Sequence, residues 1–142
     1  MQRTLTTDES PSLSRNQIQL RLMRLIYQFL FYAGFEEKPD IQALVLNEFG
    51  QPLNKIDPFA RKTLTEFLRH SGDLIPDIQS HLEGWDFDRL GYIEQAILLL
   101  GATEIRYVEL PRAVAIDVAV RLAKIYGEEK SFQLINGVLD QL

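Results

Sequence analysis

The chain has 142 residues, no cysteine and an apolar fraction of 46%. These values fit one globular domain and exclude disulfides and thiolate chemistry. No apolar run approaches the roughly 20 residues that cross a bilayer, and the polar N-terminus lacks a signal-peptide pattern, so we expect a cytoplasmic protein that does not enter membranes.

The net charge of −5 argues against a protein that holds nucleic acid through bulk positive charge. Residues 1–72 carry nine basic and eight acidic side chains, which gives +1, whereas residues 73–142 carry six and twelve, which gives −6. Two interpretations stay open. Either the acidic side chains cover solvated helix faces, or the acidic half receives a basic partner.

The N-terminal region is predicted to contain a disordered segment followed by a long helix. Residues 1–13 are rich in Ser and Thr, which is typical of disorder. A helix is predicted from Ser14 to Gly34, because Ser14 and Gln17 form a capping-box pattern and glycine often ends a helix. Apolar residues recur at helical spacing along it and should lie in the core. They are Ile18, Leu22, Met23, Leu25, Ile26, Phe29 and Leu30.

Further helices are predicted over residues 40–50 and 57–72, because each begins with aspartate, a good N-cap, and ends at glycine. A short separate helix should follow over residues 76–84. Trp85 lies between this helix and the next, and we expect it to be largely buried between the two halves of the chain.

Three more helices are predicted, over residues 88–105, 111–127 and 131–142, the last capped by Ser131. Gly137 stands inside the last helix. A glycine there costs about 1 kcal/mol against alanine, so close packing against a neighbouring helix is expected to compensate. No segment alternates like a strand, and the sequence predicts an all-α fold with about seven helices.

No pattern is typical of a catalytic site. The chain has no glycine-rich phosphate loop, GxSxG motif or cysteine nucleophile, so we expect neither an enzyme nor a cofactor. The candidate metal ligands match no standard spacing, so no metal site is expected. These residues are His70, Asp73, Asp77 and His81.

The first predicted helix carries side chains that suit nucleic acid. Arginine and amide groups contact phosphates and base edges, although the same residues also make an ordinary polar helix face. The arginines are Arg15, Arg21 and Arg24, and the amides between them are Asn16, Gln17 and Gln19.

Three segments of the C-terminal half share their order and spacing with a known family. Residues 85–98 read WDFDRLGYIEQAIL, similar to the pattern W…RL…ERAIL. Residues 111–127 read PRAVAIDVAVRLAKIYG, similar to P..VAIN followed by LAKKYG. Residues 130–140 read KSFQLINGVLD, similar to KS..FINGVLD. Together they resemble the bacterial transcription antitermination factor NusB family.

The resemblance implies two packed three-helix subdomains, over about residues 14–72 and 73–142. It also implies a factor that binds boxA-type RNA jointly with the ribosomal protein NusE and acts indirectly on the RNA polymerase elongation complex. The implied RNA-binding residues lie at the starts of the first and last helices. They are Arg15, Asn16, Gln17, Gln19, Lys130, Ser131 and Leu134. The implied partner-binding residues are Tyr27, Tyr92 and Glu94, and Glu94 is expected to turn its charge toward the basic partner.

The chain departs from the family where arginine is usual. Asn16, Gln17 and Gln19 stand in the family's arginine cluster at the start of the first helix. One alternative is therefore a NusB-fold protein–protein interaction module, acting as a homodimer, that has lost RNA binding. Another is a module related to the NusB-like domain of RNA cytosine methyltransferases.

Overall fold

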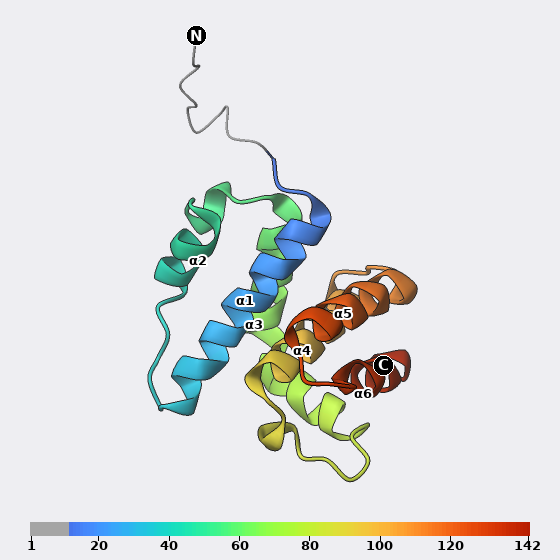
Figure 1. The fold of residues 1–142 in the computed structure, drawn as a ribbon. Coiled ribbons are helices and arrows are strands. Elements are labelled where there is room, and N and C mark those ends of the chain that lie inside the picture. The colour runs from blue at the N-terminus through green and yellow to red at the C-terminus, as the bar shows by residue number, and fades with distance from the viewer. Residues whose placement is uncertain (1–11) are drawn as a thin grey trace.

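The computed structural model describes residues 12–142, and every regular element in that range is a helix (Figure 1). The six α-helices are α1 (Arg15–Gly34), α2 (Ile41–Phe49), α3 (Pro58–Gln79), α4 (Tyr92–Tyr107), α5 (Arg112–Tyr126) and α6 (Ser131–Asp140). The two 3-10 turns are η2 (Leu53–Lys55) and η3 (Phe87–Arg89). The all-α prediction is confirmed. The segment predicted to be disordered lies outside the described residues, apart from its last two positions.

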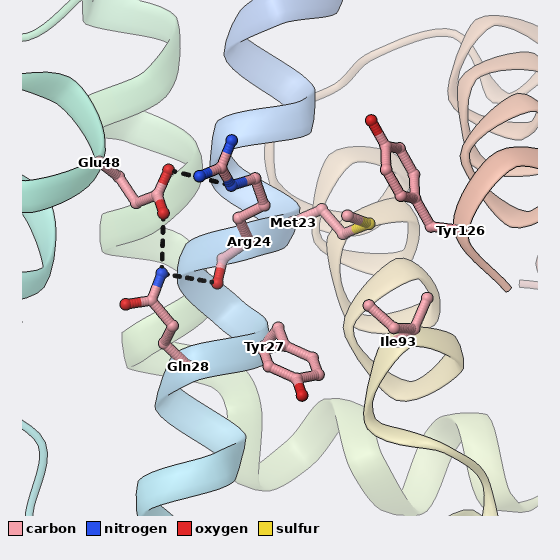
Figure 2. A pocket seen from close by; sticks show the side chains of 7 residues that line it. All are labelled: Met23, Arg24, Tyr27, Gln28, Glu48, Ile93 and Tyr126. Atoms are coloured by element: carbon pink, nitrogen blue, oxygen red, sulfur yellow. Dashed lines mark hydrogen bonds and ion pairs between the residues drawn. The ribbon is translucent and has the colours of Figure 1, made fainter.

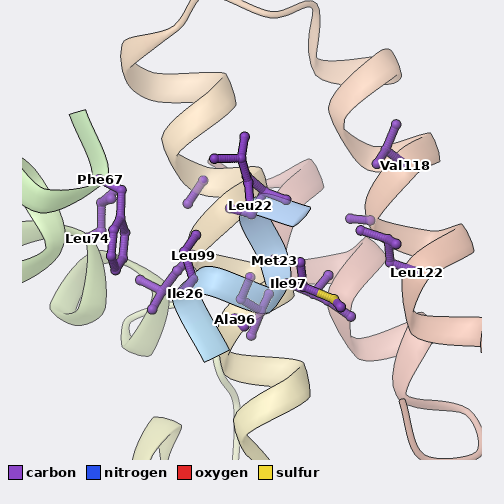
Figure 3. Packing of buried hydrophobic residues seen from close by; sticks show 14 of the residues in the cluster. Leu22, Met23, Ile26, Phe67, Leu74, Ala96, Ile97, Leu99, Val118 and Leu122 are labelled. Atoms are coloured by element: carbon purple, nitrogen blue, oxygen red, sulfur yellow. The ribbon is translucent and has the colours of Figure 1, made fainter. Parts of the chain in front are cut away.

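Helix α4 is the centre of the fold. Every residue from Glu94 to Glu104 is buried, and α4 packs against α1, α3, α5 and α6. Its sequence is apolar on nearly all sides, which is typical of a helix that other helices surround. Figure 3 shows Leu22 and Ile26 of α1 packed beside Ile97 and Leu99 of α4. Burying each such side chain contributes about 1.5–3 kcal/mol.

Helix α2 lies outside this group and packs mainly on α1. Leu44 and Val45 provide its apolar contact, and Glu48 is also buried. The Arg21 guanidinium of α1 donates to the backbone oxygen of Glu48 at 2.6 Å. None of the described helices is long and apolar enough to span a bilayer.

The predicted start signals of α1, α2 and α3 are confirmed. The Ser14 hydroxyl accepts from the backbone N–H of Gln17, and the Gln17 side chain accepts from the backbone N–H of Ser14, at 3.2 and 2.8 Å. Asp40 caps α2, and Asp57 caps α3 just before the helix starts with proline. Gly50 ends α2 in the left-handed region, with φ of 70°. These contacts involve residues close in sequence, which is why the pattern alone finds them.

Two predicted boundaries are wrong. The predicted stop at residue 72 does not end α3, which runs through to Gln79 with Pro76 inside it. Leu74 and Ile78 continue the apolar stripe and are buried, so packing outweighs the local stop signal. In addition, α4 begins at Tyr92 rather than at residue 88, because residues 87–89 form η3. The division of the chain into subdomains at residue 72 falls inside α3 and stays a prediction.

Trp85 and Gly137 do not lie where the sequence suggested. Trp85 is 55% exposed, while Phe87, two residues later, is 2% exposed and enters the core. Among residues 12–142, no atom outside the local backbone of α6 lies within 4 Å of a Cβ built on Gly137, so this glycine faces open space and serves no close contact with another described helix. The close approach involves Gly101 instead, where a Cβ would lie 2.7 Å from Leu139 Cδ1.

Candidate nucleic-acid and protein interface

The start of α1 presents Arg15 and Asn16 to solvent. The Arg15 guanidinium lies over the ring of Phe59, 3.8 Å from the ring centroid. This cation–π contact restricts the side chain and keeps its charge at the surface. Gln17 is also exposed, but its side chain is engaged in the capping box. Arg15 and Asn16 are therefore the residues of this end that are best placed to meet a polyanion.

Gln19 does not belong to this surface, and its predicted contact with RNA is wrong. Its side chain is fully buried, and its Nε2 donates to Glu104 Oε2 at 2.7 Å. Burial raises the pKa of Glu104 from 4.5 to about 7, although the Gln19 hydrogen bond and the Arg15 charge act in the opposite direction. In the part of the chain that the structure describes, the buried Oε1 atom of Gln19 has no hydrogen-bond partner. Gln19 and Glu104 thus form a polar contact inside the core between α1 and α4.

The turn between α5 and α6 carries the second group of predicted RNA-binding residues. Lys130 is exposed, and its φ of 68° places it in the left-handed region. Lys130, not Ser131, occupies the N-cap position of α6, and no side chain caps this helix. The Ser131 Oγ is buried and forms no hydrogen bond within residues 12–142. Leu134 is half-buried and packs against the core, so little of its side chain is accessible.

A groove runs between α1 and the facing ends of α4 and α5. Its two adjoining parts have volumes of about 390 and 290 Å³. Figure 2 shows Tyr27 of α1 opposite Ile93 of α4 and Tyr126 of α5. On the α2 side, Glu48 is held by Gln28 Nε2 at 2.8 Å and by Arg24 Nε at 3.4 Å.

Tyr27 and Tyr92, both predicted partner-binding residues, meet in this groove. Their rings are 6.2 Å apart in an edge-to-face arrangement. Glu94 is the third predicted partner-binding residue. Its side chain is 5% exposed, and its Oε2 accepts from the backbone N–H of Glu128 at 2.8 Å. The Glu94 carboxylate is therefore engaged within the protein, and its contact with a partner stays a prediction.

An exposed aromatic cluster at the end of α1 was missed by the sequence analysis. It consists of Phe31, Tyr32 and Phe35, which are 41%, 39% and 64% exposed. Phe31 packs against Phe35 at 5.1 Å and against Tyr92 at 6.3 Å, so the cluster continues into the groove. The spacing of Tyr27, Phe31 and Phe35, four residues apart, was the signal that could have found it.

The candidate RNA-binding residues lie toward opposite ends of α4. Gln19 near the start of α1 contacts Glu104 near the end of α4, whereas Glu94 at the start of α4 contacts the turn after α5. Ten residues of helix separate the two α4 positions by about 15 Å. A ligand that touches both Arg15 and Lys130 must therefore extend along the molecule.

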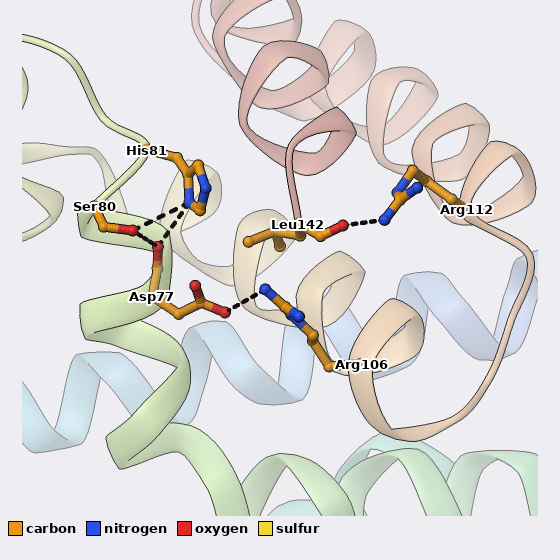
Figure 4. A network of polar contacts seen from close by, with 6 residues as sticks. All are labelled: Asp77, Ser80, His81, Arg106, Arg112 and Leu142. Carbon is orange, nitrogen blue, oxygen red and sulfur yellow. Dashed lines mark hydrogen bonds and ion pairs between the residues drawn. The ribbon is translucent and has the colours of Figure 1, made fainter.

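Other polar side chains form ion pairs and hydrogen bonds away from the groove. Figure 4 shows Arg106 paired with Asp77, at 3.0 Å, and Arg112 donating to the backbone oxygen of Leu142. His81 lies against the backbone oxygen of Asp77, and His70 pairs with Glu66 at 3.2 Å. Within residues 12–142, no group of three or more His, Asp or Glu side chains is arranged to hold a metal ion.

Comparison with known proteins identifies the family. Residues 16–142 match the model of the NusB family. The chain belongs to the NusB family. It is similar to transcription antitermination protein NusB of Finegoldia magna, with 35% identity over 89% of this chain and 91% of the relative. It is also similar to the protein of the same name from Nitratiruptor sp., with 43% identity over 80% of this chain and 83% of the relative.

Solved NusB structures share the fold. The structure of T. maritima NusB gives a TM-score of 0.78 at 24% identity and covers 92% of this chain and 91% of that one. A structure of antitermination factors NusB and NusE in complex with dsRNA gives a TM-score of 0.73 at 24% identity, covering 89% and 93%. The predicted all-α NusB fold is thereby confirmed.

Within this NusB fold, the predicted site residues fall into three groups. Those exposed to solvent remain candidates for direct contact, and they are Arg15, Asn16, Gln17 and Lys130. Those that are half-buried can contribute only part of their surface, and they are Tyr27, Tyr92, Ser131 and Leu134. Gln19 and Glu94 are buried and act within the protein.

Proposed function

We propose that the protein is a transcription antitermination factor that binds boxA-type RNA together with NusE. The observation that carries this proposal is the family match over residues 16–142. Relatives that cover most of the chain are named transcription antitermination protein NusB. A solved structure with the same fold holds NusB, NusE and dsRNA together.

On the RNA side, we assign the first contacts to Arg15 and Asn16 and the second to the turn that holds Lys130. Cationic side chains attract phosphates, and such contacts position the RNA without reading its sequence. With only Arg15 and Lys130 assigned to phosphate contacts, a chain of net charge −5 cannot hold a polyanion strongly. We therefore propose that RNA binding by this chain alone is weak and that a basic partner supplies the remaining contacts.

On the partner side, we assign the groove that contains Tyr27 and Tyr92, together with the aromatic cluster of Phe31, Tyr32 and Phe35. Exposed aromatic side chains are enriched at the centres of protein interfaces. The charge of −6 on residues 73–142 favours a basic protein such as NusE. We propose no catalytic step. The protein acts in the cytoplasm by assembly, and it reaches the RNA polymerase elongation complex only through its bound partners.

The exposed aromatic cluster also supports a second candidate function, a homodimeric interaction module without RNA binding. Sedimentation velocity and a gel shift with boxA-type RNA, each with and without NusE, separate the two. The proposed function predicts a complex of one chain with one NusE that retards the RNA. A dimer of the chain that binds neither NusE nor RNA would support the interaction module instead.

A further inference from the structure

Glu94 lies at the contact between the start of α4 and the turn after α5. Its Oε2 accepts from the backbone N–H of Glu128 at 2.8 Å. A Cβ on Gly91 would lie 2.6 Å from Glu94 Oε1, and a Cβ on Gly127 would lie 2.7 Å from Glu94 Oε2. The buried carboxylate therefore fits between two glycines, and each element can approach it only because that glycine lacks a side chain.

The turn that Glu94 contacts has few other restraints. Its backbone takes part in hydrogen bonds from Gly127 to Ala123, from Ser131 to Glu128 and from Gln133 to Lys130, at 2.8, 3.0 and 3.1 Å. Within the described part of the chain, Glu94 provides the one side-chain hydrogen bond to the backbone of residues 127–131. The turn also contains Lys130 in the left-handed region, which is costly for a residue with a side chain.

We propose that Glu94 is a positioning residue that fixes the turn of residues 127–131 and thereby holds Lys130 where it meets RNA phosphate. This inference rests on the proposed function, and it gives Glu94 a role other than direct contact with the protein partner. The hydrogen bond from Glu128 to a carboxylate is charge-assisted and stronger than one between neutral groups. Without the acceptor, the Glu128 N–H loses its partner and the turn gains conformational freedom.

The same arrangement links the two proposed surfaces. One part of the groove is lined by Tyr27 and Tyr92 together with Glu94, Gly127 and Glu128. A partner that fills this groove therefore lies against the turn that carries Lys130. Glu94 thus stands where partner binding can restrict the RNA-binding turn.

The test compares Glu94→Ala with Glu94→Gln, because the amide oxygen of glutamine keeps an acceptor and only the charge is lost. Glu128→Ala is the matched control, since it changes a charge on the same turn and leaves the backbone N–H and its acceptor in place. Hydrogen exchange of the Glu128 amide is measured by NMR. The affinity of each variant for boxA-type RNA is measured by fluorescence anisotropy, with NusE absent and present.

In Glu94→Ala, the Glu128 amide should exchange at least about tenfold faster, as expected for the loss of a hydrogen bond to a charged group. RNA affinity should fall in Glu94→Ala. Glu94→Gln should lie between Glu94→Ala and the wild type in both measurements, because its amide oxygen keeps an acceptor but loses the charge. Glu128→Ala should leave the exchange of the residue 128 amide unchanged. In a Lys130→Gln background, Glu94→Ala should cause no further loss of RNA affinity, because the two residues act through one contact.

Unchanged exchange at Glu128 in Glu94→Ala would overturn the positioning role. Faster exchange in Glu94→Ala with unaltered RNA affinity would show that the turn does not act on RNA through Lys130. The same conclusion would follow if Glu94→Ala lowered RNA affinity equally in the wild-type and Lys130→Gln backgrounds. If wild-type protein with NusE binds no RNA, the proposed function fails. The exchange measurement still decides, separately, whether Glu94 holds the turn.

Discussion

Replacing Glu104 with glutamine should stabilise the protein at neutral and alkaline pH. The Glu104 side chain is 1% exposed, and burial raises its pKa from 4.5 to about 7. Between these values the unfolded chain loses the proton while the folded protein keeps it. The free energy of unfolding therefore falls as pH rises through this window, and the loss is complete above the folded pKa.

One pKa unit corresponds to about 1.4 kcal/mol, so the cost of ionising buried Glu104 reaches about 3 kcal/mol at pH 8. In Glu104→Gln this cost is absent. The new amide can also keep the bond to Gln19 Nε2 and donate to the Gln19 Oε1, which lacks a partner. The variant should therefore match the wild type near pH 4.5 and exceed it by about 3 kcal/mol at pH 8.

Urea unfolding followed by circular dichroism at several pH values from 4.5 to 8 measures this difference. Glu129→Gln is the matched control, because Glu129 is exposed and its charge should not affect stability in the same pH window. A difference between wild type and Glu104→Gln that is the same at all pH values would refute the reasoning. So would a variant that is less stable than the wild type at pH 8.

Three further predictions follow from the same packing and surfaces. Gly127→Ala should lower the free energy of unfolding by about 1–3 kcal/mol, because its Cβ would lie 2.5 Å from Ser131 Oγ and 2.8 Å from the Ala123 backbone oxygen. Gly137→Ala, in open space, should instead raise the free energy of unfolding by about 0.5–1 kcal/mol. Thermal melts that give both variants the same midpoint would contradict this. Phe35→Ala should weaken binding of NusE in calorimetry by at least about 1 kcal/mol without lowering the melting temperature, and wild-type affinity would place the interface elsewhere. Arg15→Ala should weaken RNA binding across many sequences and make the salt dependence shallower by about 0.7 in log–log slope, so an unchanged slope would exclude a phosphate contact at this position.

Much of the fold could be predicted from the sequence because its signals are local. The Ser14 capping box and the Asp40 and Asp57 caps involve residues at most three positions apart, so the pattern alone defines them. The helical spacing of apolar residues likewise predicted the positions of α1, α5 and α6. The continuation of α3 through residue 72 could not be read in this way, because it depends on the burial of Leu74 and Ile78 in the core.

The burial of individual side chains was harder to predict than the helices. Trp85 was expected inside because it lies between two predicted helices, yet it is exposed and Phe87 is buried instead. The Gln79 side chain forms hydrogen bonds with the backbone of both residues. Glu94 and Gln19 were assigned to surfaces because the family resemblance implies contacts at those positions. Each is buried with a hydrogen-bond partner in a segment far away in sequence, at Glu128 and Glu104. Such pairs depend on tertiary packing, which a single sequence does not reveal.

The measurement that tests the central claim most directly is the affinity of labelled boxA-type RNA for this chain, for NusE and for the two together. We predict weak binding by this chain alone, with a shallow salt dependence of about −1 to −2 in log–log slope. The joint complex should bind more tightly than either protein and respond more steeply to salt. A joint complex that binds RNA no better than NusE does by itself would contradict the proposed function.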